Sequence, residues 1–168
     1  MVQKTEMVSS IIDNLRRVFK VVNEQSKKAE HETGLTGPQL WTIKVISDFA
    51  PIRVSDLARR IYLHPATVVG ILDRLESRGL VVRIRSRDDR RVVKIELTAD
   101  GRKLVVSAPE VAQGLLVAGL ETLTPAKLIS INSALKQLVQ ILGAQELPPQ
   151  LILSPEVNLP GRRRKKKA

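Results

Sequence analysis

A run of arginines around two aspartates, at residues 86–91, is the most chemically distinctive stretch of this 168-residue sequence. Asp88 and Asp89 are surrounded by arginine, which favours ion pairing over acid–base catalysis. Guanidinium groups bind phosphate oxygens through two parallel hydrogen bonds, and narrow A·T-rich minor grooves attract them. The run is therefore a candidate DNA contact. The alternative is a solvated surface turn held together by its own ion pairs.

The segment before this run, residues 65–78, has the spacing of a helix that inserts into a major groove. Val68, Ile71, Leu72 and Leu75 recur at intervals of three and four, which predicts one buried face. A major groove about 12 Å wide accepts a single α-helix, whose opposite face then meets the bases. The positions on that opposite face are Ala66, Thr67, Val69, Gly70, Asp73 and Arg74.

This outward face has few side chains that can read bases. Ala66 and Val69 can touch thymine methyl groups, and Thr67 can bond either a base or only the start of its own helix. Gly70 permits close approach of the backbone, while Arg74 can reach a phosphate or a guanine edge. We therefore expect limited direct reading of bases and a larger contribution from DNA shape.

The periodicity on both sides of these segments predicts a mainly α protein with a small β-hairpin wing, an α+β arrangement. Thr36 and Gln39 have the spacing of a capping box, and Thr98 and Thr124 are further helix caps. The helix that begins at Thr98 is expected to run to about residue 120, either straight or bent near Pro109 and Gly114. The expected helices span 5–30, 36–51, 54–61, 65–78, 98–120 and 124–142, and the expected strands span 81–85 and 92–97.

Positive charge is concentrated in two parts of the chain. Residues 53–103 carry 13 basic and 7 acidic side chains, whereas residues 104–161 carry 2 and 4. Because duplex DNA carries about one negative charge per 1.7 Å of its axis, a localised basic segment is typical of DNA-binding proteins. A solvated basic face is the alternative reading of this charge.

The second basic part ends a proline-containing tail, residues 143–168. Its last basic residues are Arg162, Arg163, Arg164, Lys165, Lys166 and Lys167. They either clamp DNA phosphates without sequence preference or form a solvated end with no measurable effect. The tail follows a predicted domain of residues 5–142, in which residues 36–98 form a winged helix-turn-helix.

Four stretches of the chain form a specific combination of motifs. They are Leu35-Thr36-x-x-Gln39-Leu40, Val54-Ser55-Asp56-Leu57-Ala58, the run from Thr67 to Val81 that contains Asp73-Arg74-Leu75-Glu76-x-x-Gly79-Leu80-Val81, and Asp89-Arg90-Arg91 followed by Ile95-Glu96-Leu97-Thr98-Ala99-Asp100-Gly101. The Asp-Arg-Arg turn followed at a fixed distance by Leu-Thr-x-x-Gly is the most specific of them. Together they resemble the MarR family of winged-helix regulators over roughly residues 8–142.

The resemblance implies roles for the arginine run. It places Arg91 in the minor groove, with Asp89 holding it there and Arg87 and Arg90 adding phosphate contacts. It also implies a sequence-specific regulator, most often a repressor, that acts as a homodimer on a pseudo-palindromic DNA operator. The helices at 5–30, 98–120 and 124–142 would form that dimer, although their apolar residues can also complete the core of a monomer.

The resemblance further implies a pocket for a small-molecule effector between the dimer helices and the DNA-binding part. The sequence contains four aromatic residues, of which Trp41 and Tyr62 are the candidates to line such a pocket. Packing in the hydrophobic core is the alternative role for both side chains.

Metal and thiol chemistry are disfavoured by composition. The chain has no cysteine, and its two histidines are His31 and His64, so a nitrogen- and sulfur-rich metal site cannot be assembled within one chain. His64 directly precedes the reading helix, and we expect it to act as a cap or a phosphate contact. No metal or cofactor is expected.

Enzyme and membrane classes are also disfavoured. The sequence has no glycine-rich phosphate loop and no Ser-His-Asp combination in a plausible setting, so we expect no catalytic activity. No apolar run approaches the roughly 18–20 residues of a membrane span, and the start of the chain lacks the pattern of a signal peptide. These features predict a cytoplasmic protein without membrane contact. The alternative to a site-specific regulator is an architectural protein that coats DNA with little sequence preference.

Overall fold

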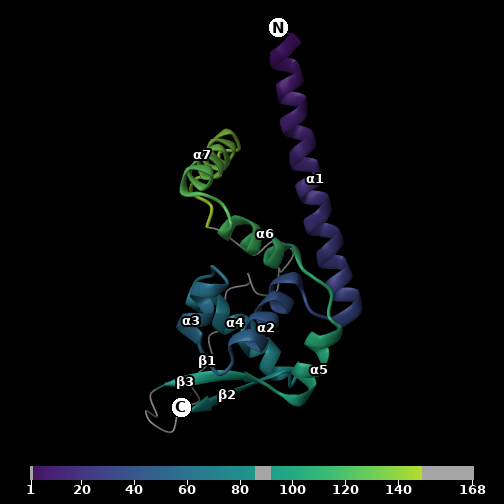
Figure 1. Cartoon of the computed structure of the whole chain (residues 1–168), viewed down its shortest axis with the longest axis vertical. Coiled ribbons are helices and arrows are strands. Elements are labelled where there is room, and N and C mark those ends of the chain that lie inside the picture. The colour runs from purple at the N-terminus through teal and green to yellow at the C-terminus, as the bar shows by residue number, and fades with distance from the viewer. Residues whose placement is uncertain (1, 86–91, 149–168) are drawn as a thin grey trace, which may run out of the picture.

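The computed structural model describes residues 2–85 and 92–148, and Figure 1 draws the remaining residues in grey. Its elements are α1 (Val2–Thr33), α2 (Gly37–Phe49), β1 (Ile52–Arg53), α3 (Val54–Arg60), α4 (Pro65–Ser77), β2 (Val81–Arg85), β3 (Val93–Leu97), α5 (Ala99–Ser107), α6 (Ala112–Glu121) and α7 (Pro125–Ile141). The predicted class, mainly α with a small β wing, is confirmed.

Residues 35–107, which we call the lobe, contribute most of the hydrophobic core, and Ala29 of α1 and Val111 before α6 complete it. Helices α2, α3 and α4 pack together on one side of the strands, as Figure 1 shows. Leu40 and Ile43 of α2 meet Leu72 of α4 and Ile95 of β3 in one cluster of fully buried side chains. The predicted capping box begins α2, because the Gln39 side chain accepts a hydrogen bond from the backbone N–H of Thr36 at 3.2 Å.

The sheet has three antiparallel strands in the order β1-β3-β2, one more than the sequence predicted. The additional strand, β1, consists of Ile52 and Arg53, which pair with Ile95 and Lys94. Two residues are too few to show an alternating pattern, so periodicity cannot reveal such a strand. Its effect is to attach the start of α3 directly to the hairpin.

The Leu-Thr-x-x-Gly motif joins the hairpin to α5 through a tight set of backbone contacts. Thr98 Oγ1 accepts a hydrogen bond from the Gly101 N–H at 3.0 Å and donates one to the Gly79 carbonyl at 2.7 Å. A β-carbon at Gly101 would lie 2.1 Å from the carbonyl oxygen of Leu80. The motif therefore requires glycine at 101, because any side chain there collides with the backbone that follows α4.

The single helix expected over residues 98–120 is interrupted near Pro109, which is one of the two positions where a bend was expected. The structure has two helices, α5 and α6, that form an angle of 76°. Pro109 lies in the break and has no N–H to continue the hydrogen-bonding ladder. The break is held in place by Val111, which is fully buried, and by an ion pair of 2.9 Å between Glu110 and Lys44 of α2.

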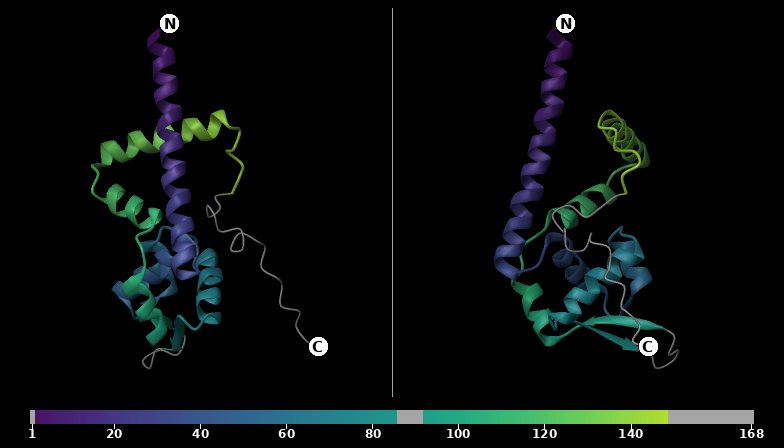
Figure 2. Two further views of the ribbon diagram at one scale, coloured as in Figure 1. Left: turned by 90° about the vertical axis from the view of Figure 1, so that its right-hand side faces the viewer. Right: turned by 180° about the vertical axis from the view of Figure 1, so that it is seen from behind.

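Two helical segments project from the lobe, and we call them the arms: residues 3–25 of α1, and α7. Figure 2 shows the rod of α1 extending past the lobe, with α7 standing apart from the lobe. Helix α1 continues through Thr33, past the expected end at residue 30. No side chain of residues 3–25 is buried, and α7 contains no buried residue.

No single helix among the described residues combines the length and the apolar composition needed to cross a membrane. The bent α5–α6 pair has the required length and apolar composition only when its two helices are counted together.

Candidate nucleic-acid interface

Helix α4 presents the face that the sequence predicted for a reading helix. Its stripe of Val68, Ile71, Leu72 and Leu75 is fully buried against the lobe. On the other side, Ala66 and Val69 are exposed, while Thr67, Gly70 and Arg74 are half-buried. The outward face is thus apolar and small near its start, as a surface that touches methyl groups and the DNA backbone requires.

The start of α4 is capped by His64. Its Nδ1 accepts a hydrogen bond from the Ala66 N–H at 3.3 Å, and Pro65 occupies the first helical position. An imidazole whose Nδ1 accepts a hydrogen bond carries its proton on Nε2 when neutral, so Nε2 can donate outward. The predicted cap is present in the structure, and contact with a phosphate stays a prediction.

The Thr67 hydroxyl does not cap α4. The predicted alternative was a hydrogen bond at the start of its own helix, but His64 has that role. Among the described residues, the Thr67 hydroxyl makes no hydrogen bond. It is therefore available to a base or a phosphate.

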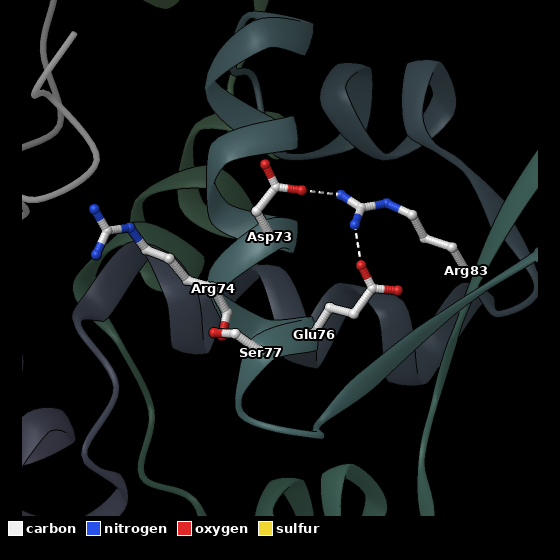
Figure 3. A network of polar contacts seen from close by, with 5 residues as sticks. All are labelled: Asp73, Arg74, Glu76, Ser77 and Arg83. Atoms are coloured by element: carbon white, nitrogen blue, oxygen red, sulfur yellow. Dashed lines mark hydrogen bonds and ion pairs between the residues drawn. The ribbon is translucent and has the colours of Figure 1, made fainter. Parts of the chain in front are cut away.

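Arg83 connects the wing to α4, and the sequence prediction missed it. Figure 3 shows its guanidinium between two carboxylates of α4: one nitrogen bonds Asp73 at 2.7 Å and the other bonds Glu76. The Arg83 side chain is only 27% exposed, so the pair is partly shielded from water. These contacts fix the base of the hairpin at one angle to the helix.

A signal for this contact exists in the sequence. The alternation of the strand puts residue 83 on the same side as the buried Val81, so an arginine there faces the helix instead of solvent. Two carboxylates spaced by three residues on α4 can then accept both of its nitrogens. In Figure 3 the side chain of Arg74 points away from this cluster, and the Ser77 hydroxyl donates to the Arg74 carbonyl at 2.8 Å.

The predicted wing contacts belong to the segment between β2 and β3 in the sequence. Strands β2 and β3 pair from Val81–Leu97 to Arg85–Val93. Arg87, Asp89, Arg90 and Arg91 fall outside the described residues, as do the basic residues 162–167 of the tail. Their contacts with DNA stay predictions.

The two proposed effector-binding residues are placed apart. Tyr62 lines a cavity of about 720 Å³ between α3, the strands and the end of α6. Trp41 is not among the residues lining that cavity; its ring lies against Gly114 of α6, where a β-carbon would come within 2.8 Å of it. The Trp41 Nε1 is buried and has no hydrogen-bond partner among the described residues. Trp41 thus has the packing role that was its alternative, and its part in a ligand pocket stays a prediction.

Tyr62 has an unusual backbone and a distant partner. Its φ is 55°, in the left-handed region, and its hydroxyl donates a hydrogen bond to Glu121 of α6 at 2.8 Å. This hydrogen bond and the negative charge of Glu121 raise the pKa of the Tyr62 phenol above its ordinary value. Since the phenol loses its proton only above that raised pKa, the contact is intact at neutral pH and is lost in alkaline solution.

Among residues 2–85 and 92–148, no group of three or more histidine, aspartate or glutamate side chains is arranged to hold a metal ion. The candidate interface consists of the outward face of α4, the hairpin of β2 and β3, and basic side chains.

Comparison with known proteins agrees with this geometry. A family model described as the MarR family matches residues 35–93. The organic hydroperoxide resistance transcriptional regulator of Bacillus subtilis (strain 168) is 30% identical over 121 residues, which is 72% of this chain and 81% of that protein. A crystal structure of a MepR-like protein complexed with pseudoligands is 27% identical and covers 82% of this chain and 98% of its own, with a TM-score of 0.54. The Staphylococcus aureus MepR–DNA complex, at 19% identity, 80% and 97% coverage and a TM-score of 0.53, shares the fold.

Proposed function

The chain belongs to the MarR family of winged-helix transcriptional regulators, and from this we propose that it is a homodimeric repressor of a pseudo-palindromic DNA operator, released by a small-molecule effector. As a member of that family it is a DNA-binding regulator of transcription. The dimer, the operator and the effector are the proposal.

The observation that carries the proposal is the Arg83 contact with Asp73 and Glu76. A reading helix and a wing recognise adjacent grooves only when the angle between them is held constant. The contacts of Arg83 hold the angle between the wing and α4. On the outward face of α4, Ala66 and Val69 are exposed. The base contacts expected of this face are few, so the wing arginines are proposed to supply most of the discrimination through groove shape.

The arms support the proposal of a dimer. Helix α7 exposes an apolar stripe, with Leu135 53% and Val139 41% exposed. Helices α1 and α6 line an apolar groove of about 330 Å³, which includes Val18 and Leu116. Apolar surface on this scale is covered by a partner in most soluble proteins, and a second copy places two α4 helices on two half-sites.

The wing assignment is tested by Arg91→Ala. Because an arginine in a narrow minor groove is attracted by enhanced negative potential, we expect operator affinity to fall by about tenfold or more. Fluorescence anisotropy with a labelled duplex from the protein's own promoter region measures this at moderate salt. Lys103→Ala, which removes one charge from the exposed face of α5, is the control and is expected to change affinity by less than about twofold. Unchanged affinity of Arg91→Ala would remove Arg91 from the interface.

The architectural alternative and the tail are tested in the same assay. A site-specific regulator binds the promoter duplex at least about a thousandfold more tightly than a random duplex of equal length, whereas a coating protein does not distinguish them. Truncation after Pro160 is expected to reduce the slope of log affinity against log salt if residues 162–167 bind phosphates, and to leave it unchanged if they are a solvated end.

A further inference from the structure

The cavity beside α3 contains positive charge that the described part of the protein does not neutralise. Its lining includes the cations Arg53, Arg59, Arg60 and Lys94 and the carboxylates Asp56 and Glu121. Both carboxylates are already engaged: Asp56 pairs with Arg59, and Glu121 accepts the hydrogen bond from Tyr62. Three cations remain without an ion-pair partner among the described residues, namely Arg53, Arg60 and Lys94.

Two of these cations directly oppose each other in the sheet. Arg53 of β1 is the register partner of Lys94 of β3, so both side chains project from the same face. Like charges in directly opposite positions destabilise a sheet unless something compensates them. An anion bound between the two side chains would offset the repulsion between them.

The third cation is held over an aromatic ring. The guanidinium carbon of Arg60 lies 3.6 Å from the centroid of the Phe49 ring, a distance typical of a cation–π contact that restrains the arginine. A guanidinium fixed in this way loses less conformational entropy when it binds an oxyanion. The cavity thus offers one oriented arginine in addition to the Arg53–Lys94 pair.

We propose that this cavity is a phosphate-binding site formed by Arg53, Arg60 and Lys94. A phosphate group carries close to two negative charges at neutral pH, which match three cations better than the single charge of a carboxylate. The cavity volume of about 720 Å³ is within the range of small-molecule sites. The phosphate belongs either to a free phosphorylated small molecule or to the backbone of bound DNA.

The position of the site gives it a way to affect DNA binding. It touches the wing through Lys94 of β3 and the turn before α4 through Tyr62. A bound anion would therefore link the hairpin to the start of the reading helix, and this consequence rests on the proposed function. The anion site itself does not depend on that function.

The first experiment titrates inorganic phosphate into the full chain at constant ionic strength and follows thermal unfolding and heat of binding. Phosphate is expected to raise the unfolding midpoint of the wild type by about 2–4 °C, because it binds the folded state alone. In Arg53→Gln/Lys94→Gln, the phosphate affinity is expected to fall by about tenfold or more. Lys20→Gln/Lys103→Gln removes the same charge from exposed positions on α1 and α5, and it is expected to stay within about twofold of wild type.

Two further measurements distinguish loss of the phosphate site from misfolding of the variant. Without phosphate, the unfolding midpoint of Arg53→Gln/Lys94→Gln should equal or exceed that of the wild type, because a like-charge pair is removed. The charge-conserving variant Arg53→Lys/Lys94→Arg should bind phosphate within about threefold of wild type. Equal phosphate affinity in the wild type and in the folded double-Gln variant overturns the proposal, and so does an equal loss in the Lys20→Gln/Lys103→Gln control.

The second experiment identifies the source of the phosphate. If it belongs to DNA, the double-Gln variant reduces the magnitude of the slope of log affinity against log salt by about 2, and duplex competes with inorganic phosphate. If it belongs to a small molecule, that slope is unchanged and phosphate alters duplex affinity in the wild type but not in the variant. Because the first titration contains no DNA, failure of the anion site is distinguishable from failure of the proposed regulator.

Discussion

The lobe and the arms follow the same sequence pattern with opposite outcomes. Leu72 in α4 and Leu135 in α7 both lie on apolar stripes spaced by three and four residues. Leu72 is fully buried, whereas Leu135 is 53% exposed. Helical periodicity indicates which face of a helix is apolar, but it does not indicate what covers that face. The difference shows that the described residues cover the apolar stripe of the lobe helix and leave that of the arm helix exposed.

The strongest test of this contrast is Leu72→Ala against Ile129→Ala. Removing a fully buried leucine leaves a cavity in the core, so we expect the free energy of unfolding to fall by about 2–5 kcal/mol. Ile129 is 70% exposed on α7, and its truncation is expected to change that free energy by less than about 0.5 kcal/mol. Urea unfolding at one protein concentration, followed by circular dichroism, measures both. Similar values for the two variants would break the contrast between lobe and arm.

A second test compares two glycines. Gly101→Ala places a β-carbon 2.1 Å from the Leu80 carbonyl oxygen, and we expect a loss of stability of about 1–3 kcal/mol. At Gly119, in α6, a β-carbon would meet no atom within 4 Å, so Gly119→Ala is expected to raise stability by about 0.5–1 kcal/mol through helix propensity. Thermal and urea unfolding of the two variants should therefore move in opposite directions. A stable Gly101→Ala protein would show that the contact between α5 and the α4–β2 turn is not rigid.

Leu135→Glu tests what covers the arms. If a second copy packs on the α7 stripe, a buried charge there is expected to weaken dimerisation by about tenfold or more. Ser133→Glu adds the same charge to the polar face of the same helix and should leave the association unchanged. Sedimentation equilibrium of the wild type and the two variants gives the comparison. A monomeric wild type, or equal association of all three proteins, contradicts the dimer.

The smallest expected effect concerns Arg83→Gln, which releases the wing from α4. The lost ion pairs are partly exposed, so stability should fall by no more than about 1 kcal/mol. Promoter affinity should fall by about threefold to tenfold, because the wing then samples several angles relative to the reading helix. Arg16→Gln breaks a solvent-exposed ion pair within α1 and is the control, with no effect expected on DNA binding. Anisotropy measurements that find the two variants equal would show that Arg83 does not position the wing.

Much of the lobe was predictable because its signals are local. The caps at Thr36, Thr98 and Thr124 and the proline at the start of α4 act within one helical turn, and all are present in the structure. The stripe of α4 and the two hairpin strands follow from periodicity over five to fourteen residues. The end of α1 was placed three residues too early, because helix ends depend on what packs against them. The bend near Pro109 was placed correctly, but it is a complete break between two helices.

The candidate site was predictable only in part. The outward residues of α4 and the cap at His64 are where the sequence indicates. Arg83 was missed although its strand position and the two carboxylates of α4 are visible in the sequence, because the pairing needs the angle between hairpin and helix. The cation pair of Arg53 and Lys94 was missed because it requires β1, a strand of two residues.

The amino-acid sequence by itself determined most of the helices, the two hairpin strands, the buried face of α4 and the family of the protein, because the signals for each lie in residues close together in the chain. Tertiary structure alone decided the contacts between distant residues: Tyr62 with Glu121, Lys44 with Glu110, and Arg53 opposite Lys94. Such contacts depend on how whole elements pack, and packing is set by the combined shape of many side chains. For the same reason, the sequence showed that the arms are apolar, and only the folded chain showed that the lobe leaves them uncovered.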